Sequence, residues 1–141
     1  MQLNISTDYA LRIIIYLSKQ DDLVTSEQIA ENTATDQNFI MRILRRMNKA
    51  GIVEIVRGKD GGYRLIKDPT EISLFEVFNI MEPTMNINQC LDDKHNCSLK
   101  AYDTCPIRSF YLKFQEEFEN TLKGVSIHDL KTKQTGELLK S

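Results

Sequence analysis

The sequence predicts a mainly α-helical protein with one small β-hairpin and a long helix near its C-terminus. Three observations carry this prediction: several segments have apolar residues at helical spacing, two short apolar runs flank a glycine cluster, and a long aromatic stripe follows Cys105. The chain has 141 residues, of which 41% are hydrophobic and 27% are charged. These values fit one ordinary globular domain and exclude a large two-domain enzyme, a disordered chain and a fibrous repeat.

The first predicted helix covers residues 5–19, where several apolar residues recur at helical spacing. Because the apolar stretch 13–17 runs around the whole helix, we expect this helix to lie centrally in the core. A short second helix begins after Thr25, which forms a capping-box pattern with Gln28. The third helix begins near Asp36 and runs to about residue 49, before Gly51.

The third helix has two distinct faces. One face is an apolar stripe with the spacing of a buried surface, formed by Ile40, Ile43, Leu44 and Met47. The opposite face is polar and basic, and presents Asn38, Met41, Arg42, Arg45 and Lys49. The sequence therefore predicts a helix that packs on the core and directs a basic face outward.

A β-hairpin is predicted after the third helix. Residues 52–57 and 63–66 are strand-like, and the glycine-rich segment 58–62 between them suits a hairpin tip. The region from residue 42 to residue 67 contains eight basic and two acidic residues, a net charge of +6. Such an excess favours binding to phosphates, although a solvated helix face followed by a polar hairpin would show a similar pattern.

Two short helices, an outward basic helix and a glycine-tipped hairpin form, in this order, a winged helix-turn-helix with a β-hairpin wing. In this arrangement the basic helix enters the major groove of double-stranded DNA, and the wing reaches the backbone or the minor groove. The sequence therefore predicts a DNA-binding domain over residues 1–82. Its expected DNA contacts are Asn38, Met41, Arg42, Arg45 and Lys49 on the helix, and Arg57 and Lys59 in the wing.

The second half of the chain is predicted to form a helix, a polar loop and a longer helix. Ser73 caps an apolar helical segment that Pro83 ends, and residues 83–105 form the polar loop. The long helix begins at Pro106 and ends before Gly124, and residues 106–141 are expected to be a dimerisation helix and tail. The aromatic stripe of this helix suits a homodimer, with packing onto the DNA-binding domain as the alternative.

The polar loop contains all three cysteines, Cys90, Cys97 and Cys105. An odd number of cysteines leaves one unpaired in any set of disulfides, and the polar surroundings do not suit buried structural cysteines. Wide spacing and the Cys-Pro dipeptide favour an iron–sulfur cluster. A zinc site with His95 as fourth ligand ranks second because the tight zinc knuckle is missing, and a dithiol switch ranks third.

Other classes of protein are disfavoured by what the sequence lacks. The longest apolar run, residues 13–17, is too short to span a membrane, and the N-terminal residues do not form a secretory signal. We therefore expect a cytoplasmic protein with no membrane partner. An enzyme is also not expected, because no nucleophile–base pair, phosphate-binding glycine loop or carboxylate pair is present.

The segments TDYALR at residues 7–12 and VRGKDGGYRL at residues 56–65, together with the three cysteines, resemble the Rrf-type bacterial transcription regulators. The resemblance implies a homodimer that binds operator DNA and holds one cluster per subunit on the cysteines. In nitric-oxide-sensing members an aspartate from the first helix of the other subunit completes the ligation, and Asp8 matches that position. Members that regulate cluster biogenesis use a histidine after the third cysteine, which this sequence lacks. Arg12 could pair with Asp8 or with the cluster.

The expected function is a DNA-binding transcriptional repressor controlled by an iron–sulfur cluster that senses nitric oxide, redox state or iron–sulfur status. Three points stay open in the sequence. The cluster is either 2Fe-2S or 4Fe-4S, its fourth ligand is Asp8, His95 or an exogenous group, and the regulator is either a repressor or an activator. The alternative function is a cluster-free winged-helix regulator that uses the cysteines as a thiol redox switch or a zinc site.

Overall fold

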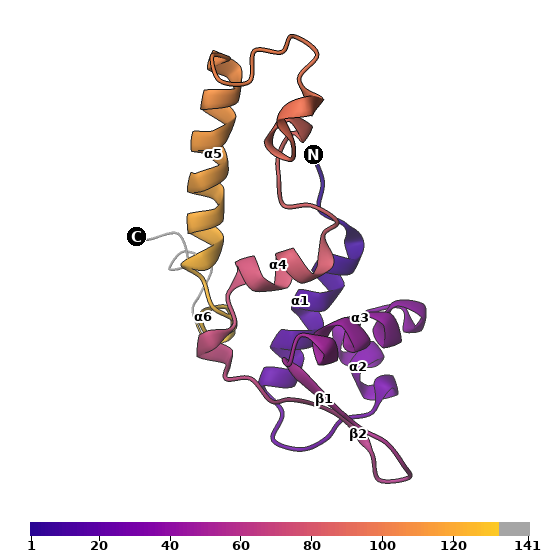
Figure 1. Ribbon diagram of the computed structural model, residues 1–141. Helices are drawn as coiled ribbons and strands as arrows, with labels where there is room; N and C mark the ends of the chain where they lie inside the picture. The colour runs from indigo at the N-terminus through magenta and orange to yellow at the C-terminus, as the bar shows by residue number, and fades with distance from the viewer. Residues whose placement is uncertain (133–141) are drawn as a thin grey trace.

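The computed structural model of the protein describes residues 1–132. Its helices and strands are α1 (Ile5–Ser18), α2 (Ser26–Thr33), α3 (Gln37–Lys49), β1 (Val53–Val56), β2 (Gly62–Leu65), α4 (Leu74–Met81), α5 (Pro106–Lys123) and α6 (Ile127–Thr132). Short 3-10 turns are η1 (Pro69–Glu71), η2 (Gln89–Leu91) and η3 (Lys94–Asn96). Helices α1 to α4 and the hairpin form a compact body, from which α5 extends (Figure 1). The mainly helical prediction is confirmed.

The helix ends follow the local signals in the sequence. The Thr25 hydroxyl accepts a hydrogen bond from the backbone N–H of Gln28, and the Gln28 side chain accepts one from the N–H of Thr25. Asp36 caps α3, and Ser73 caps α4. Gly51 follows α3 with φ +77°, a left-handed conformation that glycine adopts without steric cost.

The hairpin is fastened to the helical body along one edge. Strands β1 and β2 are antiparallel, with Val53 opposite Leu65. Val24, in the connection between α1 and α2, exchanges two backbone hydrogen bonds of 3.0 and 2.9 Å with Tyr63. These bonds fix the position of the wing relative to α2 and α3.

The core lies between α1, α3 and α4. In α1, Ile13 and Ile14 are fully buried, which confirms the predicted central helix. The predicted apolar stripe of α3 is also confirmed, since Ile40, Ile43, Leu44 and Met47 are all 0% exposed. Burial of this stripe leaves the opposite face of α3 directed outward.

Truncation of the α3 stripe should destabilise the whole domain. We expect Leu44→Ala to lower the free energy of unfolding by about 2 to 5 kcal/mol, because a fully buried leucine leaves a cavity. Urea denaturation followed by circular dichroism measures this loss. The exposed Lys49→Ala on the same helix is the matched control, and a Leu44→Ala loss no larger than that of the control would contradict the described core.

After α5 the chain returns to the winged-helix body. The backbone N–H of Ile127 donates to the carbonyl of Ile72 (2.8 Å), and Lys131 Nζ donates to the carbonyl of Ser18 (2.9 Å). The sequence of this segment was uninformative, because α6 is short and depends on these long-range contacts. The expected C-terminal tail lies partly outside the described residues. Among residues 1–132, no helix is both long and apolar enough to cross a membrane.

Candidate DNA interface and cysteine loop

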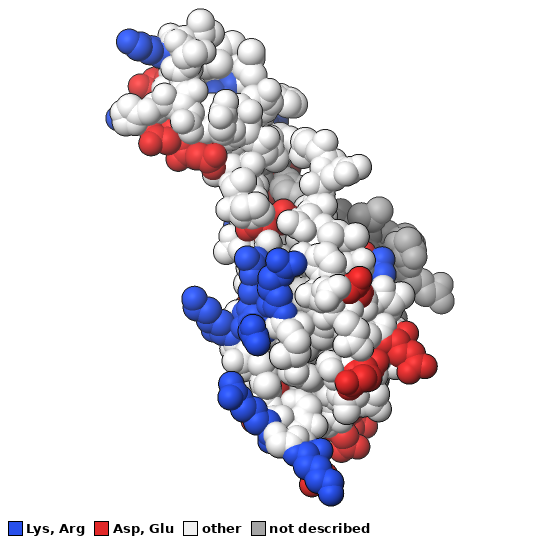
Figure 2. Space-filling view, turned by 90° about the vertical axis from the view of Figure 1, so that its right-hand side faces the viewer, with Lys and Arg blue, Asp and Glu red and all other residues white. Residues whose placement is uncertain are grey.

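The outward face of α3 and the wing form one exposed basic surface. All seven predicted DNA contacts are exposed: Asn38, Met41, Arg42, Arg45, Lys49, Arg57 and Lys59. Figure 2 shows Lys and Arg side chains gathered along one side of the body, with a smaller basic group at the far end of the molecule. The predicted residues are therefore accessible to a partner.

Of the eight basic residues between positions 42 and 67, three form side-chain ion pairs or hydrogen bonds within the chain, and Arg42 lies over the Phe39 ring, 5.4 Å from its centroid. Arg64 pairs with Glu54 at 2.7 Å, and Lys67 pairs with Glu76 at 2.8 Å. Arg46 donates to backbone carbonyls at the end of α4. Within residues 1–132, the remaining five form no ion pair: Arg42, Arg45, Lys49, Arg57 and Lys59. The cations available to DNA phosphates are thus the five predicted from the sequence.

A groove of about 800 Å³ separates α3 from the wing. Met41 and Arg45 line it from α3, and Arg57 and Lys59 line it from the wing. Tyr63 stands between the two sides, because its hydroxyl donates to the Met41 sulfur at 3.0 Å. Tyr63 was not among the residues predicted from the sequence, although its alternating position in the second strand indicates an inward side chain.

The N-terminus of α2 also borders this groove, through Thr25, Ser26 and the acidic Glu27. A helix N-terminus directs backbone N–H groups and a partial positive charge outward, which suits a phosphate oxygen. The capping box identified this helix end in the sequence, but its position beside the wing depends on the Val24–Tyr63 pairing. None of these residues was therefore among the predicted contacts.

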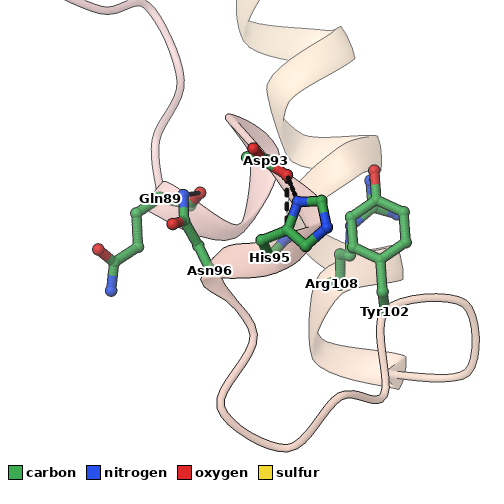
Figure 3. Close-up of polar contacts among 6 residues, drawn as sticks. All are labelled: Gln89, Asp93, His95, Asn96, Tyr102 and Arg108. Carbon is green, nitrogen blue, oxygen red and sulfur yellow. Dashed lines mark hydrogen bonds and ion pairs between the residues drawn. The ribbon is translucent and has the colours of Figure 1, made fainter.

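The three cysteines occupy three separate places in the loop before α5. Cys90 lies in η2, Cys97 directly follows η3, and Cys105 is the N-cap residue of α5. All three are half-buried thiols outside any disulfide. The Cys90 sulfur accepts a hydrogen bond from the Asn88 side chain at 3.0 Å. Figure 3 shows this loop beside the first turns of α5.

His95 is engaged with a neighbour in the same loop. Its ring Nδ1 lies 2.8 Å from Asp93 Oδ1, and its backbone N–H donates to that same oxygen at 2.9 Å (Figure 3). These bonds lower the pKa of the Asp93 carboxyl below its ordinary value. The hydrogen bond from the backbone N–H of His95 has the larger effect, and the bond to the His95 ring has the smaller one. The ring is 80% exposed, so its contact with Asp93 is made at the surface.

Arg108 stands on the first turn of α5, three residues after Cys105. Its guanidinium lies 3.6 Å from the centroid of the Tyr102 ring and donates to the Tyr102 hydroxyl (Figure 3). This stacking ties the end of the cysteine loop to α5. The Arg108 Nε atom is buried and has no hydrogen-bond partner among the described residues.

Asp8 and Arg12 form an ion pair on α1, with 2.7 Å between Oδ2 and Nη2. Arg12 also donates to the carbonyl of Thr33 at 3.3 Å. Within one chain, the local pair expected of residues four apart is therefore present. The Asp8 side chain is nevertheless 55% exposed, so its carboxylate is accessible to a second molecule.

The cysteines fit an iron–sulfur cluster in chemistry but not in placement. Three thiols within 16 residues, one of them at a helix N-terminus, are donors that suit an anionic cluster. However, among residues 1–132 no three side chains of His, Cys, Asp or Glu are grouped so that they could hold a metal ion. Cys90, Cys97, Cys105 and Asp8 are thus not assembled into one site within a single chain.

Comparison with known proteins identifies the family. The profile of the Rrf2 family, described as an iron-dependent transcriptional regulator, matches residues 3–133. The chain belongs to the Rrf2 family of transcriptional regulators. It is 38% identical over 98 residues to the HTH-type transcriptional regulator NsrR of Bacillus subtilis, an alignment that covers 68% of this chain and 67% of that protein. The resemblance seen in the sequence is confirmed.

Solved Rrf2 structures share the fold over nearly the whole chain. CymR, the global cysteine regulator of B. subtilis, superposes with a TM-score of 0.76 at 20% identity, covering 94% of this chain and 97% of CymR. IscR of T. potens superposes with a TM-score of 0.72 at 20% identity, covering all of this chain and 94% of IscR. The predicted winged helix-turn-helix with a long C-terminal helix is therefore confirmed as the fold of this Rrf2 protein.

Proposed function

We propose that this Rrf2 regulator is a homodimeric repressor whose binding to double-stranded operator DNA is controlled by an iron–sulfur cluster on Cys90, Cys97 and Cys105. The observation that carries the DNA-binding part is the set of five unpaired cations on α3 and the wing. Three of them, Arg45, Arg57 and Lys59, line both sides of one groove, so α3 enters the major groove while the wing contacts the adjacent backbone.

The control by a cluster is supported by the donor chemistry of the loop and by the iron dependence in the description of the family. Because the three thiols stand apart, loading requires the loop to rearrange around Cys105. The exposed Asp8 of the partner subunit is the proposed fourth ligand. The cluster is of the 2Fe-2S or 4Fe-4S type, and its signal is nitric oxide, redox state or iron–sulfur status.

The second candidate is a cluster-free regulator in which the cysteines act as a thiol redox switch or a zinc site. The separation of three half-buried thiols favours it, because thiols can react one at a time without a common metal. Operator titrations distinguish the candidates: the first predicts that removing iron with a chelator changes the affinity. The second predicts that only thiol oxidation or zinc removal does.

The exposed face of α5 supports a homodimer. Phe110 and Phe114 stack at 6.3 Å between ring centroids and are 65% and 44% exposed, and Ile107 is 60% exposed. We expect Phe110→Asp to convert the dimer to a monomer in size-exclusion chromatography with light scattering, because a charge in an apolar interface is costly. The exposed Lys113→Asp on the same helix is the control, and a dimeric Phe110→Asp protein would contradict this interface.

Asp8 should affect the cluster without being essential for its retention. We expect Asp8→Ala to keep a cluster on the three cysteines but to alter its visible spectrum, because one oxygen ligand is lost. If Asp8 only pairs with Arg12, spectrum and nitric-oxide response will equal those of the wild type. Arg12→Ala, which breaks the same ion pair and leaves the carboxylate, is the matched control.

A further inference from the structure

Residues 80–87, which we call the connector, comprise the last two residues of α4 and the first part of the cysteine loop, and they are bonded to three other helices. The first bonds come from Gln115 of α5, a polar side chain that is only 6% exposed. Its Oε1 accepts from the backbone N–H of Ile87 (2.9 Å), and its Nε2 donates to the carbonyl of Met85 (2.8 Å). This amide therefore pairs with the connector backbone as a neighbouring strand would.

The second attachment joins the connector to α1. Glu82 Oε1 accepts from the backbone N–H of Asn4 at 2.7 Å and from the hydroxyl of Thr7 at 2.6 Å. Thr7 is fully buried, and the Glu82 carboxylate lies at the positive end of the α1 dipole. The helix turn that it holds is the one that carries Asp8.

The third attachment joins the connector to the recognition helix. Arg46, in the last turn of α3, donates from Nη1 to the carbonyls of Ile80 (3.4 Å) and Met81 (3.3 Å). These carbonyls belong to the C-terminal end of α4, where intrahelical donors are missing. The DNA-reading helix and the first turn of α1 are thus bonded to adjacent residues of one short segment.

We propose that the connector is the joint through which the cysteine loop displaces α1 and α3, with Gln115 as its positioning residue. Gln115 holds Met85 and Ile87 on α5, while Glu82 and the preceding carbonyls hold α1 and α3. Because few residues separate these bonds, a movement of α5, at whose N-cap Cys105 of the loop lies, is passed to α1 and α3 instead of being absorbed. The inference rests on the proposed function, since it requires the loop to respond to a signal.

The structural part of the proposal is tested by amide hydrogen exchange measured by NMR on the full chain. Gln115→Met keeps the length of the side chain but loses both backbone bonds. We expect exchange roughly tenfold faster at Ile87 and also faster at Asn4, at the other end of the connector. Glu82→Ala should likewise speed amide exchange at both Asn4 and Ile87. Glu82→Gln, which keeps the acceptor oxygen, should retain wild-type exchange at both. Exchange that rises only at the directly unbonded amide would overturn the proposal.

The functional part is tested by operator affinity before and after iron removal, with a DNA duplex selected from a random pool. We expect the ratio of the two dissociation constants to fall toward one in Gln115→Met and Glu82→Ala, and to stay at the wild-type value in Glu82→Gln. The exposed Glu116→Ala on α5 is the control. If a variant exchanges fast at both Asn4 and Ile87 but keeps the wild-type ratio of dissociation constants, the connector does not transmit the signal and the proposal is overturned. If iron removal does not change the operator affinity of the wild-type protein, the proposed function is overturned instead. The exchange data then still show whether the connector couples Asn4 to Ile87.

Discussion

Replacing any one of Cys90, Cys97 and Cys105 with alanine is expected to abolish stable cluster loading and, with it, the response of operator binding to iron removal. Three thiolates provide nearly all of the ligation in the proposed site, so the loss of one leaves too few donors. Iron and acid-labile sulfide analysis after anaerobic purification measures the loading. Operator titration of the same samples measures the response.

The matched control is Ser98→Ala, an exposed position in the same loop that offers no metal ligand. It should load iron as the wild type does. A cysteine variant that retains wild-type iron and sulfide would remove that cysteine from the site. Full loading in all three variants would remove the loop from the proposed function altogether.

Arg45→Ala and Arg57→Ala are each expected to weaken operator binding by about 1 to 3 kcal/mol, roughly 5- to 150-fold, if they lose a specific base contact. If either touches only phosphate, the affinity should fall on all duplexes and the salt dependence should become shallower. The two residues line opposite sides of the groove between α3 and the wing. Fluorescence anisotropy at several salt concentrations measures both effects.

Arg64→Ala provides a control of the same charge. Arg64 is exposed in the hairpin, but its guanidinium is bound to Glu54 at 2.7 Å. Removing it should change the affinity less than removing Arg57, because the charge is already compensated within the chain. Equal losses in all three variants would indicate a general charge effect, and unchanged affinity in Arg45→Ala and Arg57→Ala would exclude this surface.

The parts of the fold that depend on local chemistry could be predicted from the sequence. Thr25 and Gln28 define a helix start between neighbouring residues, and the glycines of the wing permit a turn, with Gly58 at φ +109°. The apolar stripe of α3 fixed which face is buried. The basic residues that remained exposed and unpaired were those on the opposite face and in the wing.

The parts that depend on contacts between distant segments could not be predicted. Glu82 and Thr7 are 75 residues apart in the chain, and Gln115 and Ile87 are 28 apart. No periodicity or motif indicates such a pairing, because a side-chain bond to a distant backbone leaves no local pattern. The Lys67–Glu76 ion pair likewise depends on the fold of the segment between the hairpin and α4, whereas the Arg64–Glu54 pair follows from the hairpin register, in which these two residues are directly opposite.

Iron and acid-labile sulfide analysis of the anaerobically purified dimer, together with its visible spectrum, shows directly whether an iron–sulfur cluster is bound. We expect iron and sulfide in stoichiometric amounts and a coloured protein whose absorption changes with nitric oxide. We also expect the chelator-treated protein to bind the selected operator with a different affinity. A colourless protein that contains stoichiometric zinc, or no metal, and binds the operator unchanged after chelation would contradict control by an iron–sulfur cluster.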